Sequence, residues 1–203
     1  FATTGSRIKV RFFAGYEIDS ALNEEDPIAF AYSKGVTMGS DILESDGKSP
    51  SFLVWALRDI KRAPLDRVQV IKGWTEISGR THEKVFDVAC SWGIAPDPKT
   101  NRCANNGAKV NFENCEISKN VGSNELKTIW KDPEFDPTVK AFYYVRVLEN
   151  PTCRWSTWDA IKSGNKPRSD IPLTIQERAW SSPIWYVPNS RGVTAANILP
   201  DEV

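Results

Sequence analysis

Side chains that could catalyse a reaction are scarce in this sequence, and histidine is the scarcest, because the chain has only one, His82. A metal-dependent hydrolase of the multi-histidine type needs several imidazoles and carboxylates that converge on one point. A Ser-His-Asp arrangement would have to use His82, and no Gly-x-Ser-x-Gly motif is present. We interpret His82 as a surface residue at the start of a strand. The sequence therefore predicts no catalytic residue and no metal-ligating residue.

Two acidic groups were weighed as sites. The run Asp132-Pro-Glu-Phe-Asp136 alternates acids as a calcium loop does, but the rest of the EF-hand pattern is missing. Asp and Pro together are typical of turns, so we interpret this run as a turn. Glu177 is followed by Arg178, and neighbours on a strand face opposite sides, which favours a strand charge pair over a catalytic acid. Both could still meet partners across a sheet.

Four cysteines could form disulfides or remain free thiols. None are spaced Cys-x-x-Cys, which argues against a zinc site, and three lie in a stretch rich in Asn, Pro, Gly and Lys. Two disulfides in an exported protein are the favoured interpretation, and four reduced thiols in a cytosolic chain are the alternative. Three pairings are possible, and we favour the sequential one. It joins Cys90 to Cys103 and Cys115 to Cys153.

Tryptophan is abundant, with eight residues in the chain, and exposed tryptophan faces can stack on sugars. Trp155 and Trp158 stand at the entry of a short predicted helix beside a cysteine, so they are the candidate ligand-stacking pair. Trp55, Trp130 and Trp180 lie in apolar runs and are predicted to be core residues. A carbohydrate-binding module is therefore an alternative function.

The bulk composition excludes several partners. The chain has 26 basic and 26 acidic residues and no basic block, which argues against nucleic acid and against an anionic membrane surface. No apolar run reaches about 18 residues, so no membrane-spanning segment is predicted. The sequence opens with Phe1 instead of Met. We expect it to be a piece of a longer precursor.

Strand patterns dominate the chain. Most of them alternate apolar and polar residues, and one is apolar on both faces, which predicts a central, covered strand. The predicted strands are Ile8–Phe12, Phe52–Leu57 (the one that is apolar throughout), Arg67–Ile71, Glu83–Ala89 and Ala141–Leu148. Their β-branched and aromatic residues suit a pleated surface.

Helix patterns are few and short. Asp26–Lys34 has an acidic N-cap candidate and Pro27 at the first helical position. Ser123–Trp130 places apolar residues three and four apart, and Ser156–Ser163 opens on a near capping box. Residues 91–122 look irregular. The fold prediction is a mainly β protein: an antiparallel β-sandwich over residues 1–188, with a few short helices, a long disulfide-tied loop and a surface tail over 189–203.

The stretch Ile175–Tyr186 is rich in aromatic residues and contains Pro183, which cannot donate a hydrogen bond to a strand neighbour. We expect an edge strand, or one broken by a bulge at Pro183. Simple alternation puts Trp180, Ile184 and Tyr186 on one face and Trp185 on the other. The favoured interpretation is a strand that closes the core, and a ligand platform is the alternative.

Several segments together resemble the C-terminal part of a large bacterial family of proteins of unknown function. These are Phe1–Ile8, Leu65–Trp74, Phe135–Pro137, Ala141–Val147 and Gln176–Tyr186, and the last is quite specific. Full-length members of that family resemble PHP (polymerase and histidinol phosphatase) type metal-dependent hydrolases. The resemblance covers nearly the whole chain. It implies that the Phe-Ala-Thr-Thr-Gly segment follows a barrel-like metal domain whose His- and Asp-rich ligands lie upstream. The cysteines are not general to the family.

The resemblance implies a non-catalytic accessory domain that packs on and orients a missing catalytic domain. Its partner would be its own upstream domain or a second chain of the same precursor, which would hold the divalent metals, and this chain would hold no cofactor. Family members often carry export signals, which implies a periplasmic or extracellular location. Asp41, between a short helix and a strand, is the one residue expected to face the substrate cleft. A third, weaker hypothesis is an assembly domain that pairs through its aromatic edge.

Overall fold

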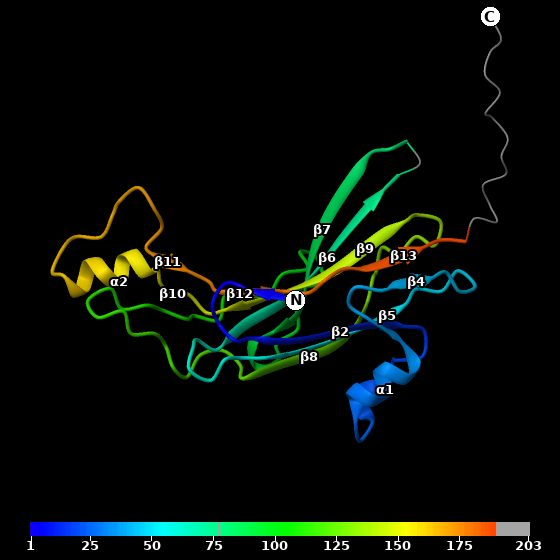
Figure 1. The fold of residues 1–203 in the computed structure, drawn as a ribbon, viewed down its shortest axis with the longest axis horizontal. Coiled ribbons are helices and arrows are strands. Elements are labelled where there is room, and N and C mark those ends of the chain that lie inside the picture. Colours follow the sequence, from blue (N-terminus) through cyan, green and yellow to red (C-terminus); the bar gives the residue numbers. More distant parts are fainter. Residues whose placement is uncertain (77, 190–203) are drawn as a thin grey trace, which may run out of the picture.

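The computed structural model describes residues 1–76 and 78–189. It confirms the predicted β-sandwich: a large, curled sheet packs face to face on a smaller one, and the main core lies between them. Figure 1 shows the two sheets with an arm that extends from one end.

The large sheet is built around β9 (Ala141–Glu149). On one side β9 pairs with β6 (Leu65–Thr75), which pairs with β7 (Thr81–Cys90). On the other side two short strands, β12 (Arg178–Trp180) and β13 (Ile184–Val187), share the length of β9. β1 (Ala2–Thr3) extends the sheet beyond β12, and β4 (Asp41–Leu43) pairs with β13 in parallel.

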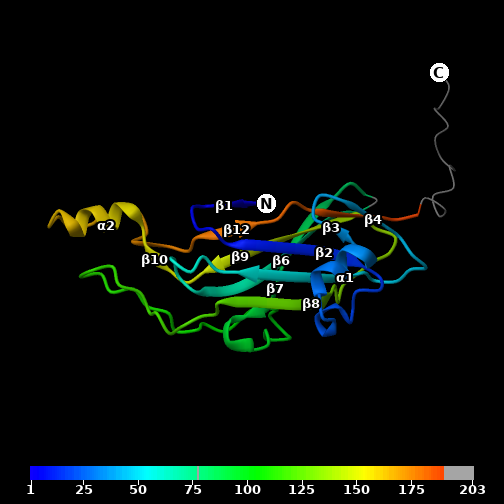
Figure 2. The same cartoon turned by 60° about the horizontal axis from the view of Figure 1, so that its bottom comes forward.

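The small sheet has the order β3 (Val36–Thr37), β2 (Lys9–Gly15), β5 (Ser51–Leu57) and β8 (Glu125–Lys131), with antiparallel pairing throughout. Figure 2 shows β2, β5 and β8 side by side. As predicted, the apolar β5 is central, and both its faces are covered.

Aromatic rings fill the centre of the main core. Phe52 on β5 lies 4.5 Å from Tyr143 on β9 and 5.8 Å from Trp130 on β8, measured between ring centroids. The Tyr143 hydroxyl donates to Asp132 Oδ2 at 2.8 Å, and Lys72 Nζ lies 2.5 Å from the same oxygen. A buried tyrosine needs such a partner, because an unpaired hydroxyl in a dry core costs free energy.

The outer face of the small sheet is covered by a helical segment. α1 (Pro27–Lys34) and the short 3-10 helix η1 (Ala21–Asn23) pack over Phe13 and Leu53. The predicted cap is present, because Asp26 accepts from the backbone N–H groups of Ile28 and Ala29 at 3.1 and 3.0 Å.

Two helix predictions need correction. Ser123–Trp130 is not a helix, because residues 125–131 form β8. Its register against β5 pairs Trp130 with Phe52 and Leu126 with Ala56, and these long-range contacts override the weak helical spacing. The other helix, α2 (Trp155–Lys162), exists, but it begins after Arg154 and no side chain caps it, so the predicted capping box does not form.

The stretch 175–186 is broken at Pro183, as expected, but the break changes which side chains face the core. Trp180 pairs with Arg146, whereas Ile184 pairs with Tyr143, so the register shifts by one residue between β12 and β13. Ile184 and Tyr186 are buried in the core, and both Trp180 and Trp185 face outward. The prediction that Trp180 is a core residue was wrong for this reason. The prediction for Trp55 was also wrong, while Trp130 packs against the core.

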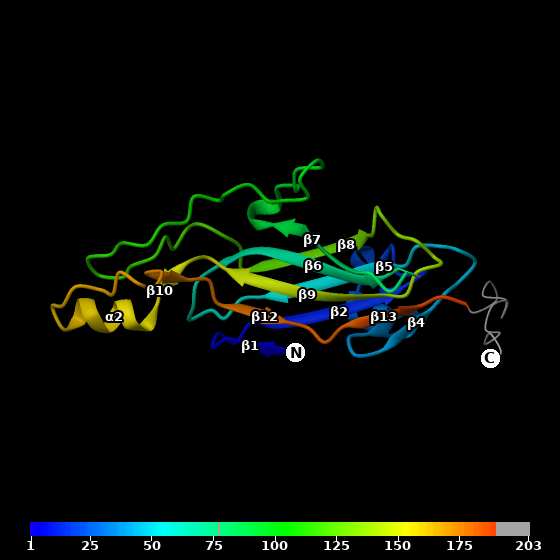
Figure 3. The same cartoon turned by 90° about the horizontal axis from the view of Figure 1, so that it is seen from above.

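An arm and a long loop project from one end of the sandwich (Figure 3). The arm is the antiparallel pair β10 (Thr152–Cys153) and β11 (Thr174–Ile175) with α2 between them. The loop joins β7 to β8 and contains only the 3-10 turn η2 (Ser91–Gly93) and isolated bridges, as the irregular composition predicted. The disulfides Cys90–Cys103 and Cys115–Cys153, the sequential pairing, tie this loop to β7 and to the arm.

Candidate functional site

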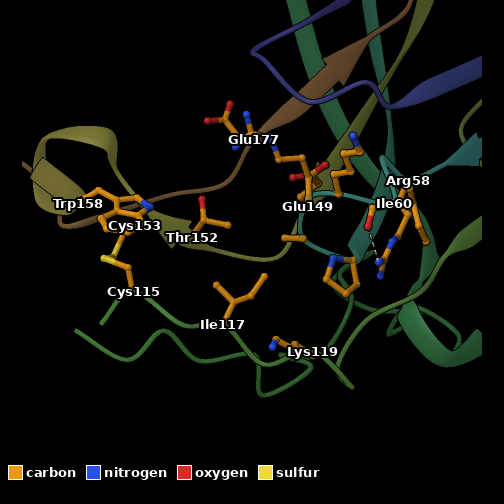
Figure 4. Close-up of a pocket in the computed structure, with 14 residues that line it drawn as sticks. Arg58, Ile60, Cys115, Ile117, Lys119, Glu149, Thr152, Cys153, Trp158 and Glu177 are labelled. Carbon is orange, nitrogen blue, oxygen red and sulfur yellow. Dashed lines mark hydrogen bonds between the residues drawn. A yellow bond between two sulfur atoms is a disulfide. The ribbon is translucent and has the colours of Figure 1, made fainter. Parts of the chain in front are cut away.

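A cleft of about 440 Å³ lies where the arm joins the sandwich. Its walls come from the loop 58–64 between β5 and β6, from the end of β9 and β10, from residues 115–119 of the long loop, and from Glu177 just before β12. Figure 4 shows Trp158 and the Cys115–Cys153 disulfide at one end of the cleft and Arg58 at the other. The volume falls within the usual range of small-molecule pockets, about 300–1,000 Å³.

The disulfide gives the cleft one fixed wall. Cys115 lies in the loop and Cys153 in β10, with their Cα atoms 5.7 Å apart. Residues 115–119 have no continuous strand or helix to hold them, and Cys115 itself has a positive φ of 59°. The covalent link to the arm therefore sets the position of this wall.

Glu149 lies at the inner end of the cleft and is fully buried. It is the last residue of β9 and shares the core-facing side of that strand with Val145 and Val147. Its backbone N–H donates to the Glu177 carbonyl at 2.9 Å, and its own carbonyl accepts from Gln176 Nε2 at 3.0 Å. In the described part of the chain its carboxyl group interacts with the Ser6 hydroxyl, and neither oxygen has any other hydrogen-bond partner.

Burial raises the pKa of Glu149 to about 7, because a carboxylate loses hydration in this position. A hydrogen bond with the nearby Ser6 hydroxyl lowers the pKa. The negative charges of Glu177 and Asp59 raise the pKa further, and Arg62 opposes them. Near neutral pH this group therefore exists in both protonation states, which is unusual for a glutamate.

Other polar atoms around the cleft also lack partners among residues 1–76 and 78–189. They are Arg58 Nε and Glu177 Oε2, both of them buried. Buried polar atoms are nearly always paired in folded proteins, so their concentration around one cleft is exceptional. Lys61, Arg62 and Lys119 add positive charge to the cleft lining. The cleft thus offers acceptors, donors and cations within a single volume.

A second cleft, of about 480 Å³, borders a polar network that is structural in character. The centre of this network is Asp87, whose side chain is fully buried. Asp87 accepts hydrogen bonds from Gln69 Nε2 at 2.6 Å, from the Cys103 backbone N–H at 2.7 Å and from Arg67 Nη1 at 2.9 Å. Asn106 donates to Asp66 at 3.0 Å. These bonds hold the long loop on the sheet. Asp87 was predicted to lie on a strand, but this network was not predicted.

The residues proposed from the sequence are scattered over the fold. Trp155 and Trp158 share α2 and are exposed, but only Trp158 lines the first cleft. Asp41 is exposed on β4 and lies away from that cleft, paired in register with Trp185. His82 lies at the start of β7, as its second residue, where its ring stacks on Trp74 at 5.0 Å and its Nε2 lies 2.7 Å from Glu76 Oε1. The acidic run 132–136 forms a turn, as predicted.

Glu149 and the role of Glu177 were not predicted from the sequence. Glu149 ends the strongest strand pattern of the chain, at a position where the alternation calls for an apolar residue. An acid on the core-facing side of a strand was the available signal. Glu177 was interpreted as a strand charge pair with Arg178, yet Arg178 Nε donates to the Gln176 carbonyl at 3.1 Å.

The outer face of the large sheet carries a second feature, an outer aromatic band formed by Phe142, Tyr144 and Trp185. The Phe142 ring lies 5.1 Å from Trp185 and 6.3 Å from Tyr144, between centroids. Trp185 is exposed and the other two are half-buried. No helix of the described residues packs over this face, in contrast to the outer face of the small sheet.

Residues 1–76 and 78–189 contain neither a cluster of metal ligands nor a membrane-spanning helix. No group of three or more His, Cys, Asp and Glu residues is placed to hold a metal ion. No helix there is both long enough and apolar enough to cross a membrane. The two disulfides indicate an oxidising compartment outside the cytoplasm.

Comparison with known proteins gives one match. A family model described as a protein of unknown function (DUF3604) matches residues 1–188. No curated protein matches the chain. No solved structure matches it either.

Proposed function

The chain belongs to the DUF3604 family, and we propose that it is a non-catalytic accessory domain of an exported, PHP-like metal-dependent hydrolase. In this role it packs on and orients a catalytic domain that lies upstream in the same precursor or arrives as a second chain. The divalent metals and the reaction belong to that partner. The compartment is the periplasm or the exterior of a bacterial cell.

The observation that carries the proposal is the outer aromatic band. Large aromatic side chains on an uncovered sheet face mark interaction surfaces, because their exposure to water is unfavourable. The outer face of the small sheet differs, because α1 packs over Phe13 and Leu53 there and covers them within this chain. The matching face of the large sheet is left for a partner.

The position of the chain's first strand supports the same arrangement. β1 pairs with β12, and Ala2 lies opposite Trp180 on the large sheet. A domain joined to Phe1 would therefore enter beside this sheet. Asp41 lies next to Trp185 on the neighbouring strand β4. In the proposed complex Asp41 is at the domain interface, which is how it would come to face the partner's substrate cleft.

The test is association between this chain and the upstream half of its precursor, produced separately and measured by calorimetry and hydrogen exchange. Binding should slow exchange along β9 and β13. Trp185→Ser should weaken binding about thirtyfold, the usual effect of losing a central aromatic contact. Trp155→Ser is the matched control, since Trp155 is more exposed than Trp185 but lies on the arm.

Two results would contradict the proposal. One is turnover of a phosphoester, or tight stoichiometric binding of a transition metal, by this chain alone. The other is association that leaves β9 and β13 unprotected and is unaffected by Trp185→Ser. Self-association that Trp185→Ser abolishes would instead support an assembly domain that pairs through this face.

A self-standing carbohydrate-binding module remains the second candidate, and one observation favours it. Trp158 lines the cleft at the base of the arm, so at least one member of the predicted pair borders a cavity. The two tryptophans do not form one platform, however, because Trp155 lies outside the cleft lining and Lys162 Nζ already sits 4.5 Å from the Trp158 ring centroid.

A further inference from the structure

The cleft at the base of the arm has charged, polar and aromatic lining residues that play no part in the proposed domain packing on the outer face of the large sheet. It is lined by Glu149 and Glu177, by Arg58 and by Trp158. Glu177 Oε2 and Arg58 Nε are buried and have no hydrogen-bond partner within the described residues, and the Glu149 carboxyl group has none there besides the Ser6 hydroxyl. Each such atom forfeits about 1–3 kcal/mol if it stays unpaired, so the arrangement is costly without a ligand.

We propose that this cleft binds a neutral, polyhydroxylated ligand, a sugar, whose hydroxyl groups pair with Glu149, Glu177 and Arg58 and whose ring lies against Trp158. The inference goes beyond the accessory role, because it concerns the other end of the sandwich and needs no upstream domain, and it rests on the second candidate function, for which it names the site.

The lining carries charges of both signs, four basic side chains and the carboxyl groups of Glu149 and Glu177, and a neutral ligand with many hydroxyl groups can pair with both kinds. An anion would meet two carboxylates, one of them fully buried with no counterion bonded to it. A cation would meet Arg58, Arg62 and Lys119 in the lining. A hydroxyl group both donates and accepts, so one sugar can satisfy a carboxylate oxygen and a guanidinium N–H together. A ligand that leaves these buried polar groups unpaired binds more weakly, so the groups also give selectivity among ligands.

The apolar part of the cleft suits the same ligand. Trp158, Ile60 and Ile117 line it, and a pyranose ring has C–H faces that pack on an indole. Lys162 occupies one face of the Trp158 ring, so the sugar stacks on the opposite face. The Cys115–Cys153 disulfide fixes the wall beside Trp158, which reduces the ordering cost of binding, whereas the buried oxygens of Glu149 must become accessible when the ligand binds.

The experiment titrates the full chain with cellobiose, xylobiose, lactose and diacetylchitobiose, followed by tryptophan fluorescence and saturation-transfer NMR. Inorganic phosphate and methylammonium serve as the anionic and cationic probes. At least one disaccharide should bind saturably, and neither charged probe should compete with it.

Variants locate the site. Trp158→Ala should abolish the fluorescence change and weaken binding at least tenfold, whereas Trp155→Ala, on the same helix but outside the lining, should change neither. Glu149→Gln keeps the shape of the side chain and should also weaken binding about tenfold, since a charged acceptor becomes a neutral one. Near-ultraviolet circular dichroism checks that each variant is folded.

Several outcomes overturn the proposal. The first is that no disaccharide binds with a Kd below about 10 mM. The second is that binding survives both Trp158→Ala and Glu149→Gln. The third is that phosphate or methylammonium binds saturably at the cleft instead. Protection of residues 115–119 and 149–153 by the upstream half, with no sugar binding, would show that a partner side chain fills the cleft. That last result would leave the accessory role intact, so the two proposals fail separately.

Discussion

The ring of Phe142 on β9 lies across Gly73 on β6, so closely that a Cβ at position 73 would overlap the ring. The two residues are direct cross-strand neighbours, and the glycine gives the ring room to lie flat between Trp185 and Tyr144. Aromatic side chains that cover a strand glycine stabilise sheets in this way. The outer aromatic band therefore depends on Gly73.

Gly73→Ala should destabilise the protein by about 1–3 kcal/mol, because the added methyl group displaces the Phe142 ring. The measurement is urea unfolding, combined with the Phe142→Ala and double variants. The double variant should be less destabilised than the sum of the two single changes, since the overlap disappears with the ring. Strictly additive effects would show that the methyl group acts on the backbone and not on Phe142.

Glu149 should make stability depend on pH. Its pKa is raised from 4.5 to about 7 by burial, with Glu177 and Asp59 adding to the effect and Ser6 and Arg62 opposing it. Between these two values the folded chain holds a proton that the unfolded chain has lost. Stability from this group is therefore greatest below about pH 4.5 and is lost as the pH rises through 7, by up to about 3 kcal/mol.

Glu149→Gln removes this titration and is the way to measure it. Relative to the parent chain, the variant should gain up to about 3 kcal/mol at pH 8.5 and show a flatter profile between pH 5 and 8.5. Asp59→Asn, an exposed neighbour, is the control and should leave most of the slope. Parallel profiles for Glu149→Gln and the parent would mean that Glu149 ionises normally.

The region around Pro183 shows which parts of the fold can be predicted from the sequence and which cannot. The proline predicts a break, and the break is there, but a one-residue shift in register then decides which tryptophan faces water. Alternation counted through the break put Trp180 in the core. The size of the shift depends on how Ser181 is held, through its N–H to the Val145 carbonyl at 3.0 Å, and this bond joins residues far apart in the chain.

The candidate cleft was predictable only in part. Trp158, Cys115 and Cys153 were chosen by residue type, and the structure places them along one wall. Glu149 continues the core-facing alternation of its strand, which was a signal in the sequence, but its complete burial beside a cleft depends on the fold. The segment 123–130 shows the same limit, since only its pairing with β5 makes it a strand.

Removing the Cys115–Cys153 disulfide should loosen the cleft more than the sandwich. The double change Cys115→Ser with Cys153→Ser opens a link over 38 residues and should cost about 2–4 kcal/mol of global stability. Hydrogen exchange should rise most in residues 112–119 and in the arm, while β5 and β9 keep their protection. The control opens the shorter Cys90–Cys103 link, over 13 residues, and should leave the arm unchanged. If hydrogen exchange in the arm rose equally in both variants, the Cys115–Cys153 disulfide would have no specific role in holding the arm.

Asp87 should be the most sensitive charged position of the network that holds the long loop. Asp87→Ala leaves the Arg67 guanidinium without that carboxylate partner and the Cys103 backbone N–H without an acceptor. Breaking a buried pair by removing one partner costs about 3–5 kcal/mol, because the remaining polar groups stay buried. Urea unfolding measures the loss. Asp170→Ala, which removes an exposed ion pair with Arg168, is the matched control and should leave stability nearly unchanged. A small effect of Asp87→Ala would mean that water enters and replaces the carboxylate, and the loop would then be held mainly by its two disulfides.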